Sequence, residues 1–378
     1  MDPDVAIIIL NWNGWNDTIE CLESLYRIDY FDYDVIVVDN SSKDDSVDKI
    51  KEYCQGKIKV KSKFFEYDQR NKPIKVFEYK EEELKAKNND NNLIGNLSSN
   101  KKIILIKNKE NYGFAEGNNI GINFAINNLK SDYILLLNND TVVDRKFLNE
   151  LINVAESRPQ IGAVGPKTYF YDFNGKKDVI CFAGGSLNMN KGESHSIGLN
   201  ETDECQYDKI RDVNYVEGSC LLVKKEVLDK IGFLDTRYFA YWEETDFCWR
   251  GFKASYKSVY VPKAKIWHKV SASFNSPIKL YYYTRNRFWF MKKNGTKKEY
   301  ISFLFNFFIY PFWRVNFDYF YDSLKFKKDF QRNKIFSKGT IDGLLYSKWF
   351  KMTTYIKNVF IKLIIEHIVK DMENFIYR

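Results

Sequence analysis

The stretch ILLLNND, Ile134 to Asp140, joins an apolar run directly to three side chains that carry oxygen. A short, continuously apolar run is typical of a strand that is buried on both faces, as in a parallel sheet covered by helices. Oxygen ligands are what hard divalent cations prefer. Asn138, Asn139 and Asp140 therefore indicate a polar site at the end of a buried strand. The alternative is that these residue types only form a turn or a helix cap, since they favour both.

A second group of reactive side chains lies in YWEETDFCWR, where Glu243, Glu244 and Asp246 crowd together. Crowded carboxylates raise each other's pKa, which brings them towards the strength of a useful general base. The alternative is an acidic first turn of a helix, in which Asp246 pairs with Arg250 four residues later. That alternative applies to Asp246 more than to Glu244.

The elements that must position these groups follow from the apolar pattern. The predicted strands are Val5–Asn13, Asp34–Ser42, Lys102–Asn108 and the run from Ile134. The predicted helices are Asp17–Arg27, a stretch from Asp44, and FAEGNNIGINFAIN. Strands that alternate with helices predict an α/β fold, with a mostly parallel, Rossmann-like sheet and helices on both faces. Ligands bind at the carboxyl ends of strands in such sheets, so the polar residues after these strands mark the expected site.

Two segments depart from this alternation. Residues 57–100 are rich in Lys, Glu and Asn, which predicts an insertion with little core of its own, partly disordered at its Asn-rich end. Residues 276–378 interleave aromatics with Lys and Arg, which predicts a helical C-terminal region after a domain of residues 1–275. Its helices could lie at a membrane interface, or pack on the catalytic domain or a second subunit.

Composition narrows the class of protein. With 44% apolar and 29% charged residues, the 378-residue chain has a globular composition. The net charge of +8 comes with no nucleic-acid recognition motif, so we expect no nucleic-acid partner. Six scattered cysteines without a CxxC pair, no secretory signal in the opening MDPD, and no run of 18 apolar residues predict a cytoplasmic protein with free thiols.

The chain lacks the glycine-rich motifs of several common classes of nucleotide-binding protein. NWNGWND, the turn after the first strand, has one glycine where a dinucleotide-binding G-x-G-x-x-G would need three, and the chain has no Walker sequence. The same turn lacks the Gly-rich, Arg- and Lys-containing loop that a sugar-nucleotide pyrophosphorylase needs. A phosphate-bearing ligand would therefore be held by a divalent cation between carboxylates and phosphates.

Six motifs occur in an informative order: VAIIILNWNG, VIVVDNSSKDDS, NYGFAEGNNIGI, YILLLNNDTVVD, VEGSCLLVKKEVLDKIGFLD and YWEETDFCWR. Together they resemble the family 2 glycosyltransferases, of the kind similar to rhamnosyl- and galactofuranosyltransferases. The resemblance covers about Val5 to Phe274 without the insertion. It implies the GT-A fold, a nucleotide-binding half followed by an acceptor-binding half, and inversion at the anomeric carbon.

The resemblance implies a metal site. NND stands where the family has its D-x-D motif, so Asp140 matches the acid that binds the cation, Mn²⁺ or Mg²⁺. Asn138 departs from the first acid, and its neutral amide suits ribose or a metal-bound water better than the ion itself. His268, in KIWHKVSASF, stands where similar enzymes complete the metal site, and neutral imidazole favours Mn²⁺. The alternative is a buried histidine satisfied by backbone.

The resemblance also implies a donor site for a UDP- or dTDP-sugar. Asp39 matches the residue that reads the nucleotide base, and its alternative role is to cap the next helix. Gly113 permits close backbone approach before a helix start near the donor. The full set of expected donor-side residues is Asn11, Asp39, Asn40, Ser41, Asn111, Gly113, Phe114, Asn118, Asn138 and Asn139.

For catalysis, the resemblance makes Glu244 the general base, with Glu in place of the usual Asp, while Glu243 or Asp246 orients the acceptor. The expected function is a metal-dependent, inverting glycosyltransferase of the hexosyltransferase type that uses a glycan or lipid-linked acceptor for cell-surface glycans. Many such acceptors are lipid-linked, which favours peripheral membrane contact through residues 276–378. The departures at Asn138 and Glu244 leave one further alternative, an inactive sugar-nucleotide-binding or scaffold protein.

Overall fold

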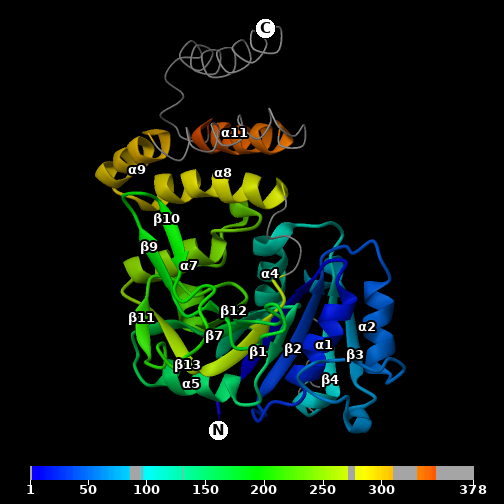
Figure 1. Cartoon of the computed structure of the whole chain (residues 1–378). Helices are drawn as coiled ribbons and strands as arrows, with labels where there is room; N and C mark the ends of the chain where they lie inside the picture. Colours follow the sequence, from blue (N-terminus) through cyan, green and yellow to red (C-terminus); the bar gives the residue numbers. More distant parts are fainter. Residues whose placement is uncertain are drawn as a thin grey trace. The chain divides into compact units, whose positions relative to one another are not determined.

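The computed structural model describes residues 2–85, 94, 97–129, 131–270, 277–309 and 330–345, and it divides the chain into two compact units (Figure 1). Unit 1 contains Met1–Asn188 and Glu193–Asn275, and unit 2 contains Met189–Gly192 and Ser276–Arg378. The Asn-rich end of the predicted insertion, residues 86–93, lies outside the described residues.

The parallel part of unit 1 contains every strand predicted from the apolar runs. In spatial order its strands are β5 (Tyr133–Asn138), β1 (Val5–Asn11), β2 (Tyr33–Asp39), β4 (Lys102–Lys107) and β3 (Lys75–Lys80). Their side chains alternate between two buried faces: Ile7 and Ile9 of β1 enter one core, and Ala6 and Ile8 enter the other. A strand buried on both faces has to be apolar throughout, which is why these runs read as continuous.

The helices of unit 1 cover both faces of the sheet. Those whose apolar residues join the same core as Ile7 are α1 (Trp15–Leu25), α2 (Ser46–Cys54) and α5 (Phe147–Glu156). Those that contribute to the opposite core are α4 (Gly113–Phe124), α6 (Lys225–Ile231) and α7 (Glu243–Lys253). The predicted mostly parallel α/β sheet with helices on both faces is confirmed.

The second half of the sheet is mixed. Its strands are β6 (Thr141–Val143), β7 (Ile161–Phe170), β8 (Ile180–Phe182), β11 (Arg211–Val213), β12 (Cys220–Lys224) and β13 (Lys257–His268). Strand β12 is antiparallel to both β5 and β7, while β13 is parallel to β7 and antiparallel to β6. The hairpin β9 (Gly185–Asn188) and β10 (Glu193–Ser196) forms a separate sheet. Single helical turns are η1 (Gln69–Asn71), η2 (Glu81–Lys85), η3 (Ser99–Lys101), η4 (Ala125–Leu129) and η5 (Thr236–Tyr238).

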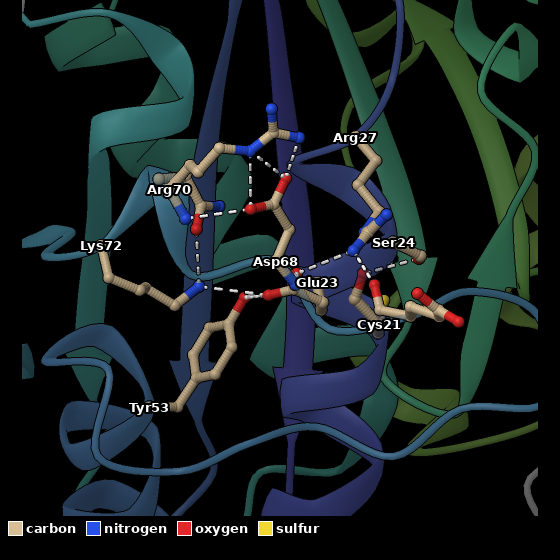
Figure 2. Close-up of polar contacts among 10 residues, drawn as sticks. Cys21, Glu23, Ser24, Arg27, Tyr53, Asp68, Arg70 and Lys72 are labelled. Carbon is tan, nitrogen blue, oxygen red and sulfur yellow. Dashed lines mark hydrogen bonds and ion pairs between the residues drawn. The ribbon is translucent and has the colours of Figure 1, made fainter.

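Residues 57–100 are more closely integrated than an insertion with little core. Strand β3 extends the main sheet in parallel beside β4, and Lys72 forms a buried ion pair with Glu23 of α1, Nζ to Oε2 3.1 Å, with side chains 2% and 1% exposed. Tyr53 donates to the same carboxylate at 2.9 Å (Figure 2). Burial lowers the pKa of Lys72, and the Glu23 carboxylate opposes that shift. The high content of Lys and Glu did not predict this buried ion pair, because composition does not reveal which charges are paired and buried.

Unit 2 is helical where it is described, with α8 (Pro277–Asn294), α9 (Lys297–Ile309) and α11 (Phe330–Leu345). Helices α8 and α11 pack closely at glycines: a Cβ on Gly343 would lie 2.8 Å from Cβ of Phe288. Phe288 also meets Phe303 and Phe307 of α9 edge-on, with ring centroids 4.9 and 4.8 Å away. Part of the aromatic content therefore forms the core of this unit. No helix among the described residues combines the length and apolar character needed to cross a membrane.

Candidate active site

The NND segment forms the turn between two strands. Strand β5 ends at Asn138 and β6 begins at Thr141, so these residues form a turn between two strands and do not cap a helix. Strand β6 pairs with β13 so that Thr141 faces His268. This register places His268 Nε2 3.0 Å from Asp140 Oδ1 and 3.5 Å from the amide nitrogen of Asn138. The predicted metal residues are therefore brought together.

The surroundings of His268 suit a cation. Its imidazole is buried, and Nδ1 has no hydrogen-bond partner of normal geometry within the described part of the chain, so the backbone-satisfied alternative does not hold. Burial would lower the pKa of His268, but the Asp140 carboxylate outweighs burial and raises it well above the usual value. A positive charge is thus favourable beside Asp140, whether it comes from a proton or from a metal ion.

Two side chains that the sequence analysis did not assign lie beside His268. Cys181 of β8 and Glu217, just before β12, have ligand atoms that lie with a His268 ring nitrogen within 4.8 Å of one another. Ser219 donates to Glu217 Oε2 at 2.8 Å. Glu217 lies in the VEGSC motif, to which the sequence analysis gave no role in the site. No sequence signal identified Cys181.

The ends of β1 and β2 form a polar edge. Asn11 and Asp39 are register partners, and the Asn11 amide donates to Asp39 Oδ1 at 2.8 Å. The Ser42 hydroxyl donates to the same oxygen at 2.6 Å, and the Ser42 N–H donates to Oδ2 at 3.1 Å. Helix α2 has Asp45 as its N-cap, so the alternative role of Asp39 as that cap is wrong. Asp39 Oδ2 retains a lone pair for a base N–H.

Several predicted donor residues form hydrogen bonds with other loops of the protein. Asn40, 1% exposed, donates to the Asn111 side chain at 2.9 Å and to the Gly113 carbonyl at 3.1 Å. The Ser41 hydroxyl donates to the Lys109 carbonyl at 3.2 Å. Asn118 donates back along α4 to the Phe114 carbonyl at 2.8 Å. These contacts position the edge of the site.

The loop that contains Phe239 forms hydrogen bonds with the start of α4. The Phe239 carbonyl accepts from the N–H groups of Phe114 and Ala115 at 2.6 and 3.2 Å. Gly113 has φ +78°, and a Cβ there would lie 2.5 Å from Phe239 Cδ2. The close approach expected at Gly113 is therefore made by Phe239, and these two N–H groups are already taken.

Asn139 connects the NND turn to the loop after β1. Its amide donates to the Thr18 hydroxyl at 3.0 Å and to the Gly14 carbonyl at 3.3 Å, and Thr18 donates in turn to Asn11 at 2.8 Å. A Cβ on Gly14 would lie 2.7 Å from the Asn139 amide nitrogen. One hydrogen-bonded chain thus links the ends of β1, β2 and β5.

Glu243 and Glu244 are the first two residues of α7. Glu243 is 4% exposed, and its Oε2 has no hydrogen-bond partner among the residues that the structure describes. Burial and then the charge of Glu244 raise the pKa of Glu243 well above its usual value. Burial also raises the pKa of Glu244, with a contribution from Glu217, and Thr245 donates to Glu244 at 3.0 Å. Because Glu243 is buried and Glu244 half-buried, burial favours the protonated form of Glu243 more strongly than that of Glu244.

Asp246 forms the ion pair with Arg250 that the sequence offered as its alternative role. Its side chain is fully buried, and it accepts from Arg250 Nε at 2.8 Å and from the Tyr238 hydroxyl at 3.2 Å. Arg250 also donates to the carbonyl of Phe233 at 2.7 Å. This pair ties α7 to the preceding loop.

The loop before α7 has an unusual backbone. Phe239, Tyr241 and Trp242 all have positive φ, at 65°, 68° and 76°. Non-glycine residues pay for this conformation, and such residues cluster at functional sites. The Gly218 backbone lies beneath the helix start, where an added Cβ would be 3.8 Å from Cβ of Glu244 and 3.3 Å from the Phe114 ring.

The mixed α/β sheet, the polar edge at its carboxyl ends and the acidic pair on α7 define a protein with the GT-A fold. The chain belongs to glycosyltransferase family 2: "Glycosyltransferase like family 2" matches residues 92–289, and "Glycosyl transferase family 2" matches residues 6–72.

Two named glycosyltransferases are similar to part of this chain. The low-salt glycan biosynthesis hexosyltransferase Agl10 of Haloferax volcanii is 24% identical over 172 residues, 44% of this chain and 50% of that protein. The N-acetylglucosaminyl-diphospho-decaprenol L-rhamnosyltransferase of Mycobacterium tuberculosis is 30% identical over 147 residues, 36% of this chain and 47% of that protein. The matched region thus spans about half the length of these relatives.

A solved structure supports the fold. The mannosyltransferase PcManGT from Pyrobaculum calidifontis, in complex with GDP-Man and Mn²⁺, superposes with a TM-score of 0.51 at 12% identity, over 93% of this chain and 88% of that chain. At this identity the similarity concerns the fold alone.

Proposed function

We propose that this protein is a metal-dependent, inverting glycosyltransferase that moves a sugar from a UDP- or dTDP-sugar to a glycan or lipid-linked acceptor. The observation that carries the proposal is the contact of Asp140 with His268, 3.0 Å apart, together with the carboxylate pair Glu243 and Glu244 at the start of α7. The names of the similar hexosyltransferase and rhamnosyltransferase support the class of reaction.

The donor lies along the polar edge. Asp39 accepts the imide N–H of uracil or thymine, while Asn11 and Ser42 hold its carboxylate in place. Asp140 and His268 would hold a divalent cation, with Asn138 beside them. When bound, the cation would supply positive charge for the leaving diphosphate.

Glu244 acts as the general base. It takes the proton from the acceptor hydroxyl as that oxygen attacks the anomeric carbon, and the bond from this carbon to the diphosphate oxygen breaks on the opposite face. The bonding electron pair leaves with the nucleoside diphosphate, which gives inversion. Glu243, whose pKa is raised well above its usual value, stays protonated beside Glu244 and orients its carboxylate.

Peripheral membrane contact through unit 2 is the second part of the proposal. Helix α9 exposes Ile301 (56%) and Phe305 (67%), one turn apart, and it begins with Lys297 and Lys298. An apolar face beside lysines suits anionic lipid head groups. Flotation with anionic vesicles tests this contact: binding that is lost in an Ile301→Ser, Phe305→Ser double variant supports it. A full chain that ignores these vesicles contradicts it.

The function is tested by a screen of nucleotide sugars. We expect one UDP- or dTDP-sugar to raise the thermal unfolding midpoint only with Mn²⁺, and to be hydrolysed or transferred. Glu244→Gln is the matched control, because it should show the same stabilisation without turnover. Stabilisation without turnover in the unmodified chain favours an inactive sugar-nucleotide-binding protein. The absence of both rejects the proposal.

A further inference from the structure

Cys181 and Glu217 lie beside the cation residues, and the proposed function uses neither of them. They come from β8 and from the loop before β12, while His268 ends β13. One sulfur, one carboxylate oxygen and one imidazole nitrogen converge within 4.8 Å of one another. A tetrahedral Zn²⁺ site has ligands at about 2.0–2.3 Å, so small side-chain rotations would bring such atoms onto one cation.

Cys181 is buried and Glu217 half-buried, and neither pairs with a lysine or arginine among the described residues. Cys181 is 6% exposed. A thiol, a carboxylate and an imidazole that converge in this way are together a set of metal donors.

The need for further donors follows from the NND segment. The amide of Asn138 is a weak, neutral ligand, so Asp140 is the single carboxylate of this turn. Glu217 supplies a second carboxylate close to the same histidine. A thiolate is a soft ligand, and together with imidazole it favours Zn²⁺ or Co²⁺ over Mg²⁺.

We propose that Cys181 and Glu217 join His268 as ligands of the divalent cation, so that this chain holds its metal through a thiolate. The inference rests on the proposed function only in placing that cation beside the donor diphosphate. It goes beyond what the family resemblance implies, because the resemblance gives Asp140 and His268 as the metal residues and assigns no metal role to Cys181 or Glu217. Its consequence is a preference for softer cations.

Cobalt spectroscopy on the full chain tests the proposal, with Co²⁺ alone as the probe. We expect a thiolate-to-cobalt charge-transfer band in the unmodified chain, and its loss in Cys181→Ser. Glu217→Gln should weaken Co²⁺ binding by at least about 10-fold, since the loss of a group that merely supports a metal ligand already costs that much. Cys181→Ser should weaken Zn²⁺ binding much more than Mg²⁺ binding.

The chain offers two matched controls. Cys21 is buried under the same turn, with Sγ 3.6 Å from the Thr141 hydroxyl, and Cys205 is the exposed cysteine. Both Cys21→Ser and Cys205→Ser should keep the band. A band that is absent from the unmodified chain, that survives in Cys181→Ser, or that disappears in either control overturns the proposal.

The experiments distinguish a failure of this inference from a failure of the proposed function. A chain that hydrolyses a nucleotide sugar with Mn²⁺ but shows no thiolate band retains its function and loses this inference. A band that depends on Cys181 in a chain that hydrolyses no nucleotide sugar supports the inference and rejects the function.

Discussion

His268 Nε2 lies 3.0 Å from Asp140 Oδ1, and the contact joins the last strand of the sheet to the turn after β5. The antiparallel pairing of β6 with β13 produces it, since Thr141 and His268 are register partners. Lys269, the next residue, donates its N–H to the Asp140 carbonyl at 3.0 Å. Backbone pairing therefore holds the two candidate ligands together independently of any bound ion.

Asp140→Ala is expected to abolish cation-dependent donor binding while the fold is retained. The turn contains no second carboxylate that could replace Asp140. Calorimetric titration with UDP and dTDP, with and without Mn²⁺, measures the effect. Asp144→Ala is the control, because Asp144 follows β6 and accepts from the Lys146 N–H at 2.9 Å. Undiminished Mn²⁺ dependence in the Asp140 variant would show that the metal site was assigned wrongly.

Glu244→Gln is expected to lower the transfer rate by ~10²–10⁴-fold, the usual cost of losing a general base. Donor affinity should change little, because the amide keeps the volume of the side chain. Glu243→Gln should cost much less, since an amide imitates the protonated acid that Glu243 already is. The comparison uses the same donor and acceptor at saturating Mn²⁺. If Glu243→Gln is inactive and Glu244→Gln turns over normally, the roles of the two residues are reversed.

The raised pKa values predict a pH dependence with a definite sign. Glu244 accepts a proton only when ionised, and burial raises its pKa, so kcat/KM should fall as the pH drops through that raised value. The pH profile of kcat/KM for Glu244→Gln should lack this decrease at acidic pH. A rate in the unmodified chain that does not change over acidic pH would contradict the assignment of a buried base.

Stability should change with pH in the opposite direction. Glu243 has a raised pKa in the folded state, so the folded protein binds more protons than the unfolded chain between the two pKa values. The contribution to the free energy of unfolding is greatest below about pH 4.3, the ordinary value for Glu, and declines as the pH rises. Denaturant unfolding of Glu243→Gln should show a weaker decline than the unmodified chain. An equal decline in both would contradict the raised pKa.

Asp246→Asn is expected to destabilise the fold by about 3 kcal/mol, because it leaves Arg250 partly buried without its carboxylate. Equilibrium unfolding measures this, and Asp229→Asn is the control, since its pair with Lys225 is exposed. If Asp246→Asn keeps full stability but loses activity at unchanged donor affinity, Asp246 has the acceptor-orienting role instead.

Gly113→Ala is expected to impair both stability and activity. The left-handed backbone alone costs an alanine on the order of 1–2 kcal/mol. The new methyl group would also lie 2.6 Å from the Phe239 carbonyl and displace the loop that precedes α7. Gly175→Ala is the control, since φ is +86° there and nothing lies within 4 Å of the added Cβ. Equal losses in both variants would show that Phe239 does not constrain this position.

The apolar pattern was sufficient to predict the parallel strands, the helices between them, and the edge where a site would form. Each of these strands is a continuous apolar run in the sequence. A strand that is buried on both faces needs apolar residues, whichever elements lie beside it. The NND turn and the EETD helix start were likewise readable, because their residue types are unusual next to such runs.

Contacts between distant segments were decided only in three dimensions. The register of β6 with β13 placed His268 at Asp140, and the path of β8 brought Cys181 beside them. The same holds for Asn40, which binds loops of the protein itself, and for β3 of the predicted insertion, which completes the sheet. Asparagines and charged residues have similar local patterns whether they bind a ligand or another part of the chain. The partner within reach decides between the two, and that partner is set by strand pairing across long separations in the sequence.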